Sequence, residues 1–366
     1  MWRWFISTGL IVGLLIVILI SYNPTSQTTT ETADGVYRGT KASTTLTSEV
    51  IGANNTKAIF FVGDIMLARQ VERLSKQFGL DYPYRRFVIF PTDSLVVANF
   101  EAAVPAEHIP TPDFTFRFSV DEILLPPLRN FGVTHASLAN NHAFDFGRAG
   151  YHNTIHRLRE SDIMPFGHPV EIGESTHTIL DLGQEKVALF GLMAIDSSPD
   201  YEALKTQLAG LPDELLTIAY IHWGQEYELR PSARQQAVAR ELVALGFNLI
   251  IGHHPHVVQS IGLVGDVPVI YSLGNFIFDQ YFSAEVMTGL MLELKTETGS
   301  YHLSMFGVTS SDVRAQPRLM TEAEASGFFA ELAEYSDDTL RSSIIAQRLI
   351  FEPRLASFRE SVIMQQ

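Results

Sequence analysis

Six short polar motifs in this 366-residue chain each lie beside or after a run of apolar residues. They are rich in Asp, Glu, Asn and His, the side chains that bind divalent metal ions and transfer protons. The motifs are Gly63-Asp64, Asn99-Phe100-Glu101, Asn140-Asn141-His142-Ala143-Phe144-Asp145, His222-Trp223-Gly224, His254-Pro255-His256 and Gly274-Asn275. Because a hydrolytic metal centre on an α/β scaffold requires polar clusters at strand ends, this series predicts such a centre.

The elements that must position these motifs alternate between strands and helices. The predicted strands are 58–63, 95–100, 133–138, 176–182, 187–191, 215–221, 248–251 and 267–271, and the predicted helices are 65–78, 122–131, 148–159 and 232–245. Residues 289–295 and 301–308 have the pattern of a two-stranded ribbon, and residues 321–346 that of a helical segment. Strands that are apolar on both faces and separated by helices indicate a layered α/β fold, whose active sites lie beyond the strand ends.

The amino-terminal segment has the composition of a membrane anchor. Residues 5–20 carry no charge and consist largely of Ile, Leu and Val, a length near the lower limit for spanning about 30 Å of hydrocarbon. Arg3 precedes this segment and no charge follows it before Glu31, which predicts a cytoplasmic amino terminus and an extracytoplasmic domain. No small-x-small cleavage site follows Ile20, so a single-pass signal anchor at residues 1–22 is favoured over the alternative, a cleaved signal peptide.

Composition limits what the remainder can be. Residues 23–56 are rich in Ser and Thr and poor in large apolar residues, so we expect a flexible linker. Residues 57–310 are long enough to form a large core, and residues 311–366 are predicted to be a helical extension. The absence of Cys excludes a lipoprotein anchor and disulfides, and the net charge of −15 argues against nucleic acid as a partner.

Several motifs extend into longer runs that carry a family resemblance. These runs are Gly63-Asp64-Ile65-Met66-Leu67-Ala68-Arg69, Ala98-Asn99-Phe100-Glu101, Leu138 to Gly147, His222 to Tyr227, Gly252 to Gln259 and Tyr271 to Asp279. In this order, over roughly residues 57–294, the chain resembles the CapA/PgsA family of poly-γ-glutamate capsule biosynthesis proteins. The resemblance implies a membrane-anchored ectodomain with a calcineurin-like metallophosphoesterase fold, a four-layer α/β/β/α sandwich. It also implies the cytoplasmic membrane, poly-γ-glutamate or another anionic polymer, and membrane synthase subunits as partners.

The resemblance further implies roles for individual residues. The implied metal ligands are Asp64 and His256 at a first ion, Asn141, His222 and His254 at a second, and Glu101 as the bridging carboxylate, with one or two Mn, Zn or Fe ions as cofactor. His142 occupies the position of a general acid that protonates a leaving oxygen, and Asp145 is placed to orient it. Arg69 and Asn275 are candidates for contacts with the substrate or with the ligands.

Two local details affect this assignment. His254 and His256 are two residues apart, so they share a face if the backbone is extended, as Pro255 favours for the residue before it; His253 would then point away. The usual first metallophosphoesterase motif is Asp-x-His, but Met66 stands two residues after Asp64, and a thioether is a poor ligand for a hard ion. The first site could therefore be weaker, completed by another residue or empty, and a one-metal protein stays possible.

Structural roles compete with these functional ones. Asp64 precedes a predicted helix and could be its N-cap, and Asn140 to His142 could form a turn. An isolated His such as His135 or His177 is more often structural than a ligand.

Two classes of function fit the sequence. The first is a metal-dependent hydrolase outside the membrane that acts on a phosphoester, or on an amide or ester during polymer transfer. The second is a non-catalytic accessory subunit that binds the polymer and helps a membrane synthase to export or retain it. The full set of motifs favours the enzyme, whereas Met66 favours the accessory subunit.

Overall fold

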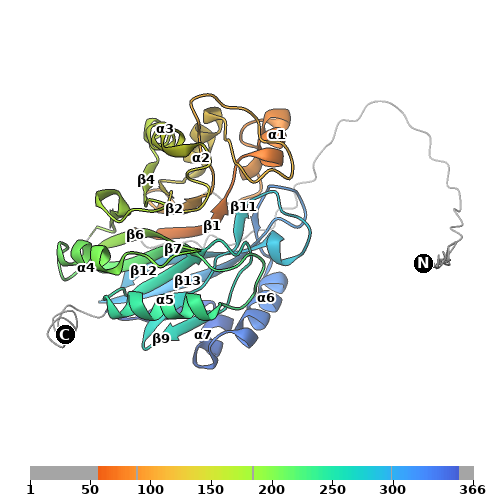
Figure 1. Cartoon of the computed structure of the whole chain (residues 1–366). Coiled ribbons are helices and arrows are strands. Elements are labelled where there is room, and N and C mark those ends of the chain that lie inside the picture. The colour runs from red at the N-terminus through yellow and green to blue at the C-terminus, as the bar shows by residue number, and fades with distance from the viewer. Residues whose placement is uncertain (1–56, 88–89, 184, 298, 354–366) are drawn as a thin grey trace, which may run out of the picture. The chain divides into compact units, whose positions relative to one another are not determined.

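The computed structural model describes residues 57–353 apart from 88–89, 184 and 298. The predicted anchor at residues 1–22 and linker at residues 23–56 lie outside this range. Within it, no helix has the length and hydropathy needed to cross a membrane. The described residues belong to one compact unit, residues 48–366, and contain two β-sheets and the helices that cover them (Figure 1).

The first sheet contains the strand that leads to the Asp64 motif. Its order in the described residues is β14-β13-β12-β1-β2-β3-β4, with β11 also paired to β1 and β15 to β13. Their bounds are β1 Ile59–Ile65, β2 Leu95–Phe100, β3 His135–Ser137, β4 Met164–Phe166, β11 Asn275–Ile277, β12 Thr288–Glu297, β13 Ser300–Thr309, β14 Arg318–Leu319 and β15 Arg348–Phe351. β1 to β4 run parallel, so the carboxyl ends of β1, β2 and β3 lie at one edge of the sheet.

The second sheet has the order β5-β6-β7-β8-β10-β9 in the described residues. The bounds are β5 His177–Asp181, β6 Lys186–Ala194, β7 Leu216–Trp223, β8 Leu249–His253, β9 Ile261–Val264 and β10 Val267–Ile270. The four central strands run parallel and the two outer ones antiparallel. The carboxyl ends of β7 and β8 therefore deliver the second group of polar motifs to one edge.

The described helices are α1 Arg69–Phe78, α2 Leu125–Phe131, α3 Gly147–Glu160, α4 Tyr201–Ala209, α5 Ala233–Ala244, α6 Glu322–Tyr335 and α7 Arg341–Ile345. Short 3₁₀ turns are η1 Tyr82–Tyr84, η2 Glu122–Leu124, η3 Glu174–Thr176, η4 Glu285–Met287 and η5 Asp338–Leu340. Local capping explains several starts: Asp200 caps α4, and Ser232 and Thr321 begin α5 and α6 with reciprocal capping boxes.

Three groups of buried apolar residues separate four layers. One packs α1, α2 and α3 against the outer face of the first sheet, a second lies between the sheets, and a third packs α4 and α5 on the outer face of the second sheet. Period-two alternation sorts the side chains: Phe60 points to the helices, whereas Phe61 points between the sheets. Burying one such side chain contributes about 1.5–3 kcal/mol. Figure 1 shows α1 to α3 on one side of β1 and β2.

The elements differ from the predictions mainly at their ends. The helix predicted from residue 65 begins at Arg69, because β1 continues to Ile65. The short strands β4, β9, β11, β14 and β15 and helix α4 were not predicted. Residues 311–353 do form helices α6 and α7, but β14 and β15 also pair with β13. This part of the predicted extension therefore shares the first sheet and the core between the sheets.

Candidate metal centre

The polar motifs meet between the two sheets, at the carboxyl ends of β1, β2, β7 and β8. Val97 of β2 faces the core between the sheets, so Asn99 and Glu101, two and four residues later, face the same way. In the second sheet Tyr220 faces this core, and His222 follows on the same face. Alternation within ordinary strands thus directs carboxylate, amide and imidazole groups into one buried volume.

Asp64 reaches this volume through an irregularity in β1. Phe60 and Val62 face the helices, and so does Ile65, which means that the alternation changes between them. The register of β1 shifts against β2 between Phe61 and Asp64, and against β11 between Asp64 and Ile65. Irregularities of this kind redirect a side chain at the end of a strand. Asp64 is thereby turned toward the space between the sheets.

Gly63 allows the backbone approach that this irregularity needs. The amide of Asp64 donates to the carbonyl of Gly274 over 2.9 Å. A Cβ at residue 63 would lie 2.1 Å from that same carbonyl oxygen. Only glycine fits at this position, because the obstacle is backbone and has no rotamer to change.

The carboxylate of Asp64 is fully buried and surrounded by donors. Its Oδ1 lies 2.9 Å from Asn99 Nδ2 and 2.9 Å from His253 Nδ1. Its Oδ2 lies 3.3 Å from the backbone amide of His254 and 3.5 Å from His256 Nδ1. Burial raises the pKa of Asp64, but the hydrogen bonds from His253 and His256 outweigh it and hold the pKa well below its ordinary value. Asp64 is therefore a carboxylate.

Glu101 lies where two groups of ligand atoms overlap. One group is Glu101, His254 and His256, and the other is Asp64, Glu101 and His222; within each group the ligand atoms all lie within 4.8 Å of one another. Glu101 Oε1 is buried and has no hydrogen-bond partner among the described residues. The Nε2 atoms of His256 and His142 lie 3.6 and 3.8 Å from it, beyond hydrogen-bonding distance.

The donor set fits a divalent metal ion. A buried carboxylate oxygen without a partner is costly, and a cation in contact with it would remove that cost. His254 Nδ1 is also buried without a partner among the described residues. Imidazole nitrogen and carboxylate oxygen together suit Mn, Zn or Fe, and Glu101 belongs to both groups of possible ligands.

The surroundings shift the pKa values of the three candidate histidine ligands in different directions. Burial and the neighbouring His254 hold the pKa of His222 well below its ordinary value, and burial with His256 lowers the pKa of His254 to about 4. Burial also acts to lower the pKa of His256, but the carboxylates of Glu101 and Asp64 outweigh it and raise that pKa to about 9. Burial is the main cause that raises the pKa of Glu101 to about 7. Two neutral imidazoles are thus ready to act as ligands.

The backbone at the His254-Pro255-His256 motif is not extended, and the prediction that it would be is wrong. His254 has φ of 95° and His256 has φ of 59°, both in the left-handed region. Such residues cost about 1–3 kcal/mol each and are held in place by the surrounding structure. The amide of Tyr227 donates to the carbonyl of Pro255 over 2.8 Å, which is one such restraint. The two imidazole rings still converge, with centroids 5.9 Å apart.

Asn141 and His142 lie at the mouth of the centre. Asn141 is exposed, and its Oδ1 is 2.9 Å from His222 Nε2. His142 Nδ1 is 2.9 Å from Asp145 Oδ2, and its ring lies on Phe118 with centroids 4.1 Å apart. Asp145 also accepts the amide of Phe118, over 2.6 Å. Asp145 is therefore placed to orient His142, leaving Nε2 directed toward Glu101.

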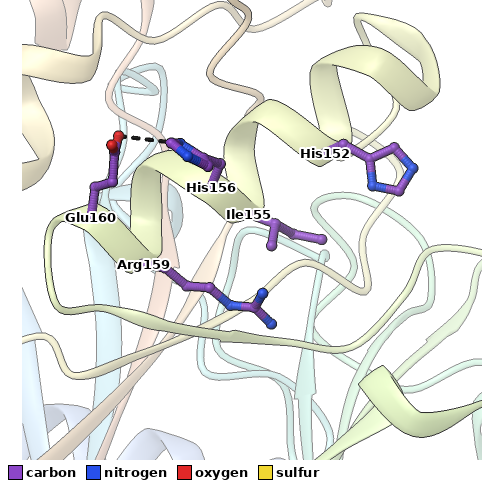
Figure 2. A pocket seen from close by; sticks show the side chains of 5 residues that line it. All are labelled: His152, Ile155, His156, Arg159 and Glu160. Carbon is purple, nitrogen blue, oxygen red and sulfur yellow. Dashed lines mark ion pairs between the residues drawn. The ribbon is translucent and has the colours of Figure 1, made fainter.

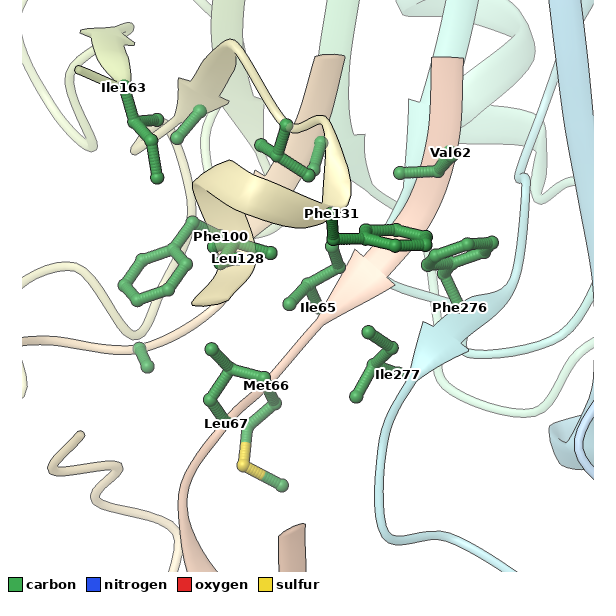
Figure 3. Packing of buried hydrophobic residues seen from close by; sticks show 14 of the residues in the cluster. Val62, Ile65, Met66, Leu67, Phe100, Leu128, Phe131, Ile163, Phe276 and Ile277 are labelled. Atoms are coloured by element: carbon green, nitrogen blue, oxygen red, sulfur yellow. The ribbon is translucent and has the colours of Figure 1, made fainter. Parts of the chain in front are cut away.

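Met66 belongs to the core and not to the centre. It is fully buried among apolar side chains, and Figure 3 shows it beside Leu67 and Ile277. Its sulfur lies 3.1 Å from the amide of Ala68. The register shift at Asp64 explains the placement: residues 65 and 66 leave the strand on the helix side of the sheet.

The two predicted contact residues have defined partners. Arg69, at the start of α1, forms a buried ion pair with Asp279 and lies over the ring of Phe118 with its guanidinium carbon 4.6 Å from the centroid. Asn275 Oδ1 lies 3.0 Å from His256 Nδ1 and so orients that imidazole. Asn275 therefore contacts His256, a candidate metal ligand. Arg69 packs against the ring of Phe118, and Asp279 balances its charge.

Sequence reasoning missed two residues that hold Asp64. Asn99 contacts Asp64 and also lies 3.2 Å from His222 Nδ1. His253 pairs in register with His222 across β7 and β8. The signal for both was alternation: Asn99 is two residues before Glu101, and His253 is two residues after Ile251, which faces the core between the sheets. The prediction had counted back from His254 and His256 as an extended segment, and it therefore placed His253 facing away from the centre.

All of these residues lie within the part of the chain that matches a known family. The family described as "Bacterial capsule synthesis protein PGA_cap" matches residues 58–280, more than half of the chain. The chain belongs to this family. Capsule biosynthesis protein CapA of Bacillus anthracis is 30% identical to it over 283 residues, which cover 71% of this chain and 67% of CapA. PGA biosynthesis protein CapA of Bacillus subtilis is 30% identical over 238 residues, which cover 60% of this chain and 63% of that protein.

The chain thus spans about two thirds of the length of these two PGA_cap relatives. Among solved structures, a purple acid phosphatase from yellow lupin seeds matches with a TM-score of 0.34 and 9% identity, covering 75% of this chain and 55% of that one. A likeness at this level carries no argument about fold or function. The PGA_cap match includes every residue of the centre but ends before β12 to β15.

A separate hollow lies along α3 of this PGA_cap protein (Figure 2). It is lined by His152, Ile155, His156, Arg159 and Glu160, and none of these residues belongs to the centre. His156 Nδ1 and Glu160 Oε2 are 3.2 Å apart, one helical turn from each other. Both side chains are exposed, so this pair is a solvated contact on a helix surface and contributes little to stability.

Proposed function

We propose that this PGA_cap protein acts in capsule biosynthesis outside the cytoplasm, attached to the membrane, with a centre that holds one or two divalent metal ions and supports hydrolysis or transfer. The observation that carries the proposal is Glu101, whose buried Oε1 lacks a partner among the described residues while His254 and His256 offer ligand atoms nearby. A resident Mn, Zn or Fe ion would supply Lewis-acid activation of a phosphoester, ester or amide.

The residues of the chain have distinct parts in this proposal. Asp64, Glu101, Asn141, His222, His254 and His256 would hold the metal. Asp145 fixes His142 so that its Nε2 can give a proton to a leaving oxygen. Asn275 fixes the orientation of His256 from the other side. The four layers and the strand-end position of the centre support a metallophosphoesterase-like sandwich as the fold.

The proposed setting follows from the family and from the sequence. The names of the two Bacillus relatives, one for capsule and one for PGA biosynthesis, support poly-γ-glutamate or another anionic capsule polymer as the material handled. A membrane synthase as the assembly served is what the family resemblance implies. The uncharged segment at residues 5–20 supports a single-pass anchor with the amino terminus in the cytoplasm.

A non-catalytic accessory role is the second candidate, and Met66 favours it. The residue two positions after Asp64 is buried in the core and offers no ligand to the centre. If only one ion binds, the protein could hold an anionic polymer through that ion without turning it over.

Metal content tests the proposal. The described residues form a compact unit with its own core, so a chain of residues 48–366 can be purified without the predicted anchor. We expect one or two ions per chain by inductively coupled plasma mass spectrometry, and fewer than half as many in His222→Ala/His254→Ala. The matched control is His135→Ala/His177→Ala, which removes two histidines outside the centre and should leave the content unchanged. Absence of metal after resupply with Mn, Zn and Fe would overturn the metal centre.

A second measurement separates the two functions. Phosphodiester and γ-glutamyl model substrates would be tested with the metal-loaded protein and with His142→Gln. Turnover that falls at least tenfold in the variant at unchanged metal content supports the enzyme. Full metal content without turnover of any substrate supports the accessory role.

A further inference from the structure

Three largely exposed phenylalanines line one cavity near the centre. Phe114 is 92% exposed, Phe116 74% and Phe282 65%. The cavity has a volume of about 310 Å³, and its lining also includes Arg69 and Tyr227. We call Phe114, Phe116 and Phe282 the aromatic rim. Exposed apolar side chains grouped in this way mark an interaction site more often than single exposed residues do.

The aromatic rim lies next to the candidate metal ligands. The ring of Phe282 meets that of Tyr227 edge-on at 5.1 Å between centroids, and Tyr227 lies 6.2 Å from the ring of His256. Gln280 donates to the hydroxyl of Tyr227 over 3.1 Å and accepts from Asn275 over 3.0 Å. One layer of residues therefore separates the rim from the centre.

The loop that carries Phe114 and Phe116 is tied down on both sides of these rings. Before them, Asp113 pairs with Arg73 of α1 at 2.7 Å. After them, Arg117 donates to the carbonyl of Asp145 over 2.6 Å. Phe114 itself has φ of 62°, a strained conformation for a bulky residue. The protein thus holds this ring in solvent at a cost, although burial would be favourable.

Charge argues against an anionic polymer as the partner of the rim. Of the arginines nearby, Arg69 is paired with Asp279 and Arg73 with Asp113, whereas the exposed Arg117 donates to the carbonyl of Asp145. The chain as a whole carries a net charge of −15. The rim therefore offers apolar and aromatic surface without a free cation among the described residues that line the cavity.

We propose that the aromatic rim inserts into the interfacial region of a lipid bilayer, so that the side of the domain next to Tyr227 and His256 faces the membrane. Aromatic rings are the side chains that concentrate at this interface. Separate protruding rings suit insertion between lipids. This inference goes beyond the proposed metal chemistry and does not depend on it.

The chain length before the described residues is compatible with this orientation. The cavity of the rim lies beyond the carboxyl end of β1, where Arg69 and Gln70 line it, about 20 Å from the start of the strand near Lys57. The 34 residues from 23 to 56 can reach at most about 120 Å. An anchor at residues 5–20 would therefore allow the opposite end of the domain to contact the same bilayer.

Vesicle sedimentation tests the proposal with residues 48–366, which lack the predicted anchor. The probe is phosphatidylcholine vesicles, alone or with one quarter phosphatidylglycerol. We expect binding to both, little changed between about 0.1 and about 0.5 M NaCl, because insertion is apolar. Phe114→Ser/Phe116→Ser/Phe282→Ser should weaken binding at least tenfold at an unchanged melting temperature. The matched control is Val170→Ser/Ile345→Ser/Ile350→Ser, which removes three exposed apolar residues from other places and should bind like the wild type.

Three results would overturn the proposal. Absence of binding to either vesicle would exclude membrane insertion by this domain. Binding only to the anionic vesicles, abolished by salt, would assign the contact to charge. Self-association in sedimentation velocity that the rim variant abolishes, without lipid binding, would assign the rim to a second copy of the chain. Because none of these measurements uses metal or turnover, failure here leaves the proposed function untouched.

Discussion

His135 shows how burial of one titratable side chain makes stability depend on pH. It lies on β3, and burial, with a smaller effect of Arg129, lowers its pKa to about 4. The unfolded chain binds a proton near pH 6.5, so between pH 6.5 and 4 the unfolded state holds more protons than the folded state. Protonation of His135 therefore leaves the unfolding free energy nearly unchanged above about pH 6.5 and lowers it as the pH falls from 6.5 toward 4.

We therefore expect His135→Gln to reduce the acid sensitivity of the protein. Between pH 7 and pH 4 the wild type should lose about 3 kcal/mol more unfolding free energy than the variant. Urea denaturation at pH 4, 5, 6, 7 and 8 measures the difference. At pH 8 the offset between the two proteins gives the cost of the substitution itself. Parallel curves for the two proteins would show that His135 is not the group responsible.

Met66 occupies the position of a ligand in the usual motif, yet its side chain is part of the core. Met66→His would place a polar ring among apolar side chains, on the opposite side of the sheet from Glu101. We expect a loss of about 2–4 kcal/mol of unfolding free energy and no gain in bound metal. Thermal melting and metal analysis of the same preparation check both parts. A variant that binds one more ion per chain would show that the backbone after Asp64 can turn the new side chain into the centre.

At the scale of elements, the irregular end of β1 directs the carboxylate of Asp64 into the metal centre. Gly63→Ala would put a methyl group 2.1 Å from the carbonyl oxygen of Gly274, which is backbone and has little freedom to move. We expect a loss of at least about 3 kcal/mol of unfolding free energy and lower metal content, because Asp64 would shift with its neighbour. Thermal melting and metal analysis measure the two effects.

Gly327→Ala is the matched control for this prediction. Gly327 lies in α6 and is exposed, and a Cβ added there would meet open space, with no side chain within 4 Å. Alanine should stabilise the helix by about 0.5–1 kcal/mol and leave metal content as in the wild type. Both variants exchange glycine for alanine. Equal changes in melting temperature would therefore contradict the claim that a Cβ at residue 63 collides with the backbone of Gly274.

At the scale of the whole molecule, the carboxyl-terminal segment completes the fold. Phe329 and Leu332 of α6 and Leu349 of β15 belong to the core between the sheets, together with Leu303 and Met305 of β13. A chain that ends at residue 310 would expose this surface. We expect it to aggregate or to lose its cooperative melting transition.

Circular dichroism and size-exclusion chromatography of two truncated chains test this dependence. The control ends at residue 353 and keeps every described strand, so it should melt cooperatively as a monomer. If the chain ending at residue 310 behaves in the same way, the metal-binding part is an independent domain and the extension is an addition to it.

The sequence alone was sufficient to predict the layered α/β architecture and the strand-end location of the polar motifs. Both follow from local patterns: period two in strands, helical periodicity between them, and side-chain chemistry. Asn99 could also have been identified, since it shares a strand face with Glu101. The metal, its ligands and the membrane anchor stay predictions until they are measured.

Tertiary structure decided which way the critical side chains point. The register shift at Asp64 depends on pairing with β2 and β11, which are distant in sequence. The left-handed backbone at His254 and His256 is likewise imposed by surrounding contacts, because their own preferences favour other conformations. Met66 in the core and His253 against Asp64 follow from these non-local constraints. Spacing along the chain predicts a face only while the backbone stays regular, and at this centre it does not.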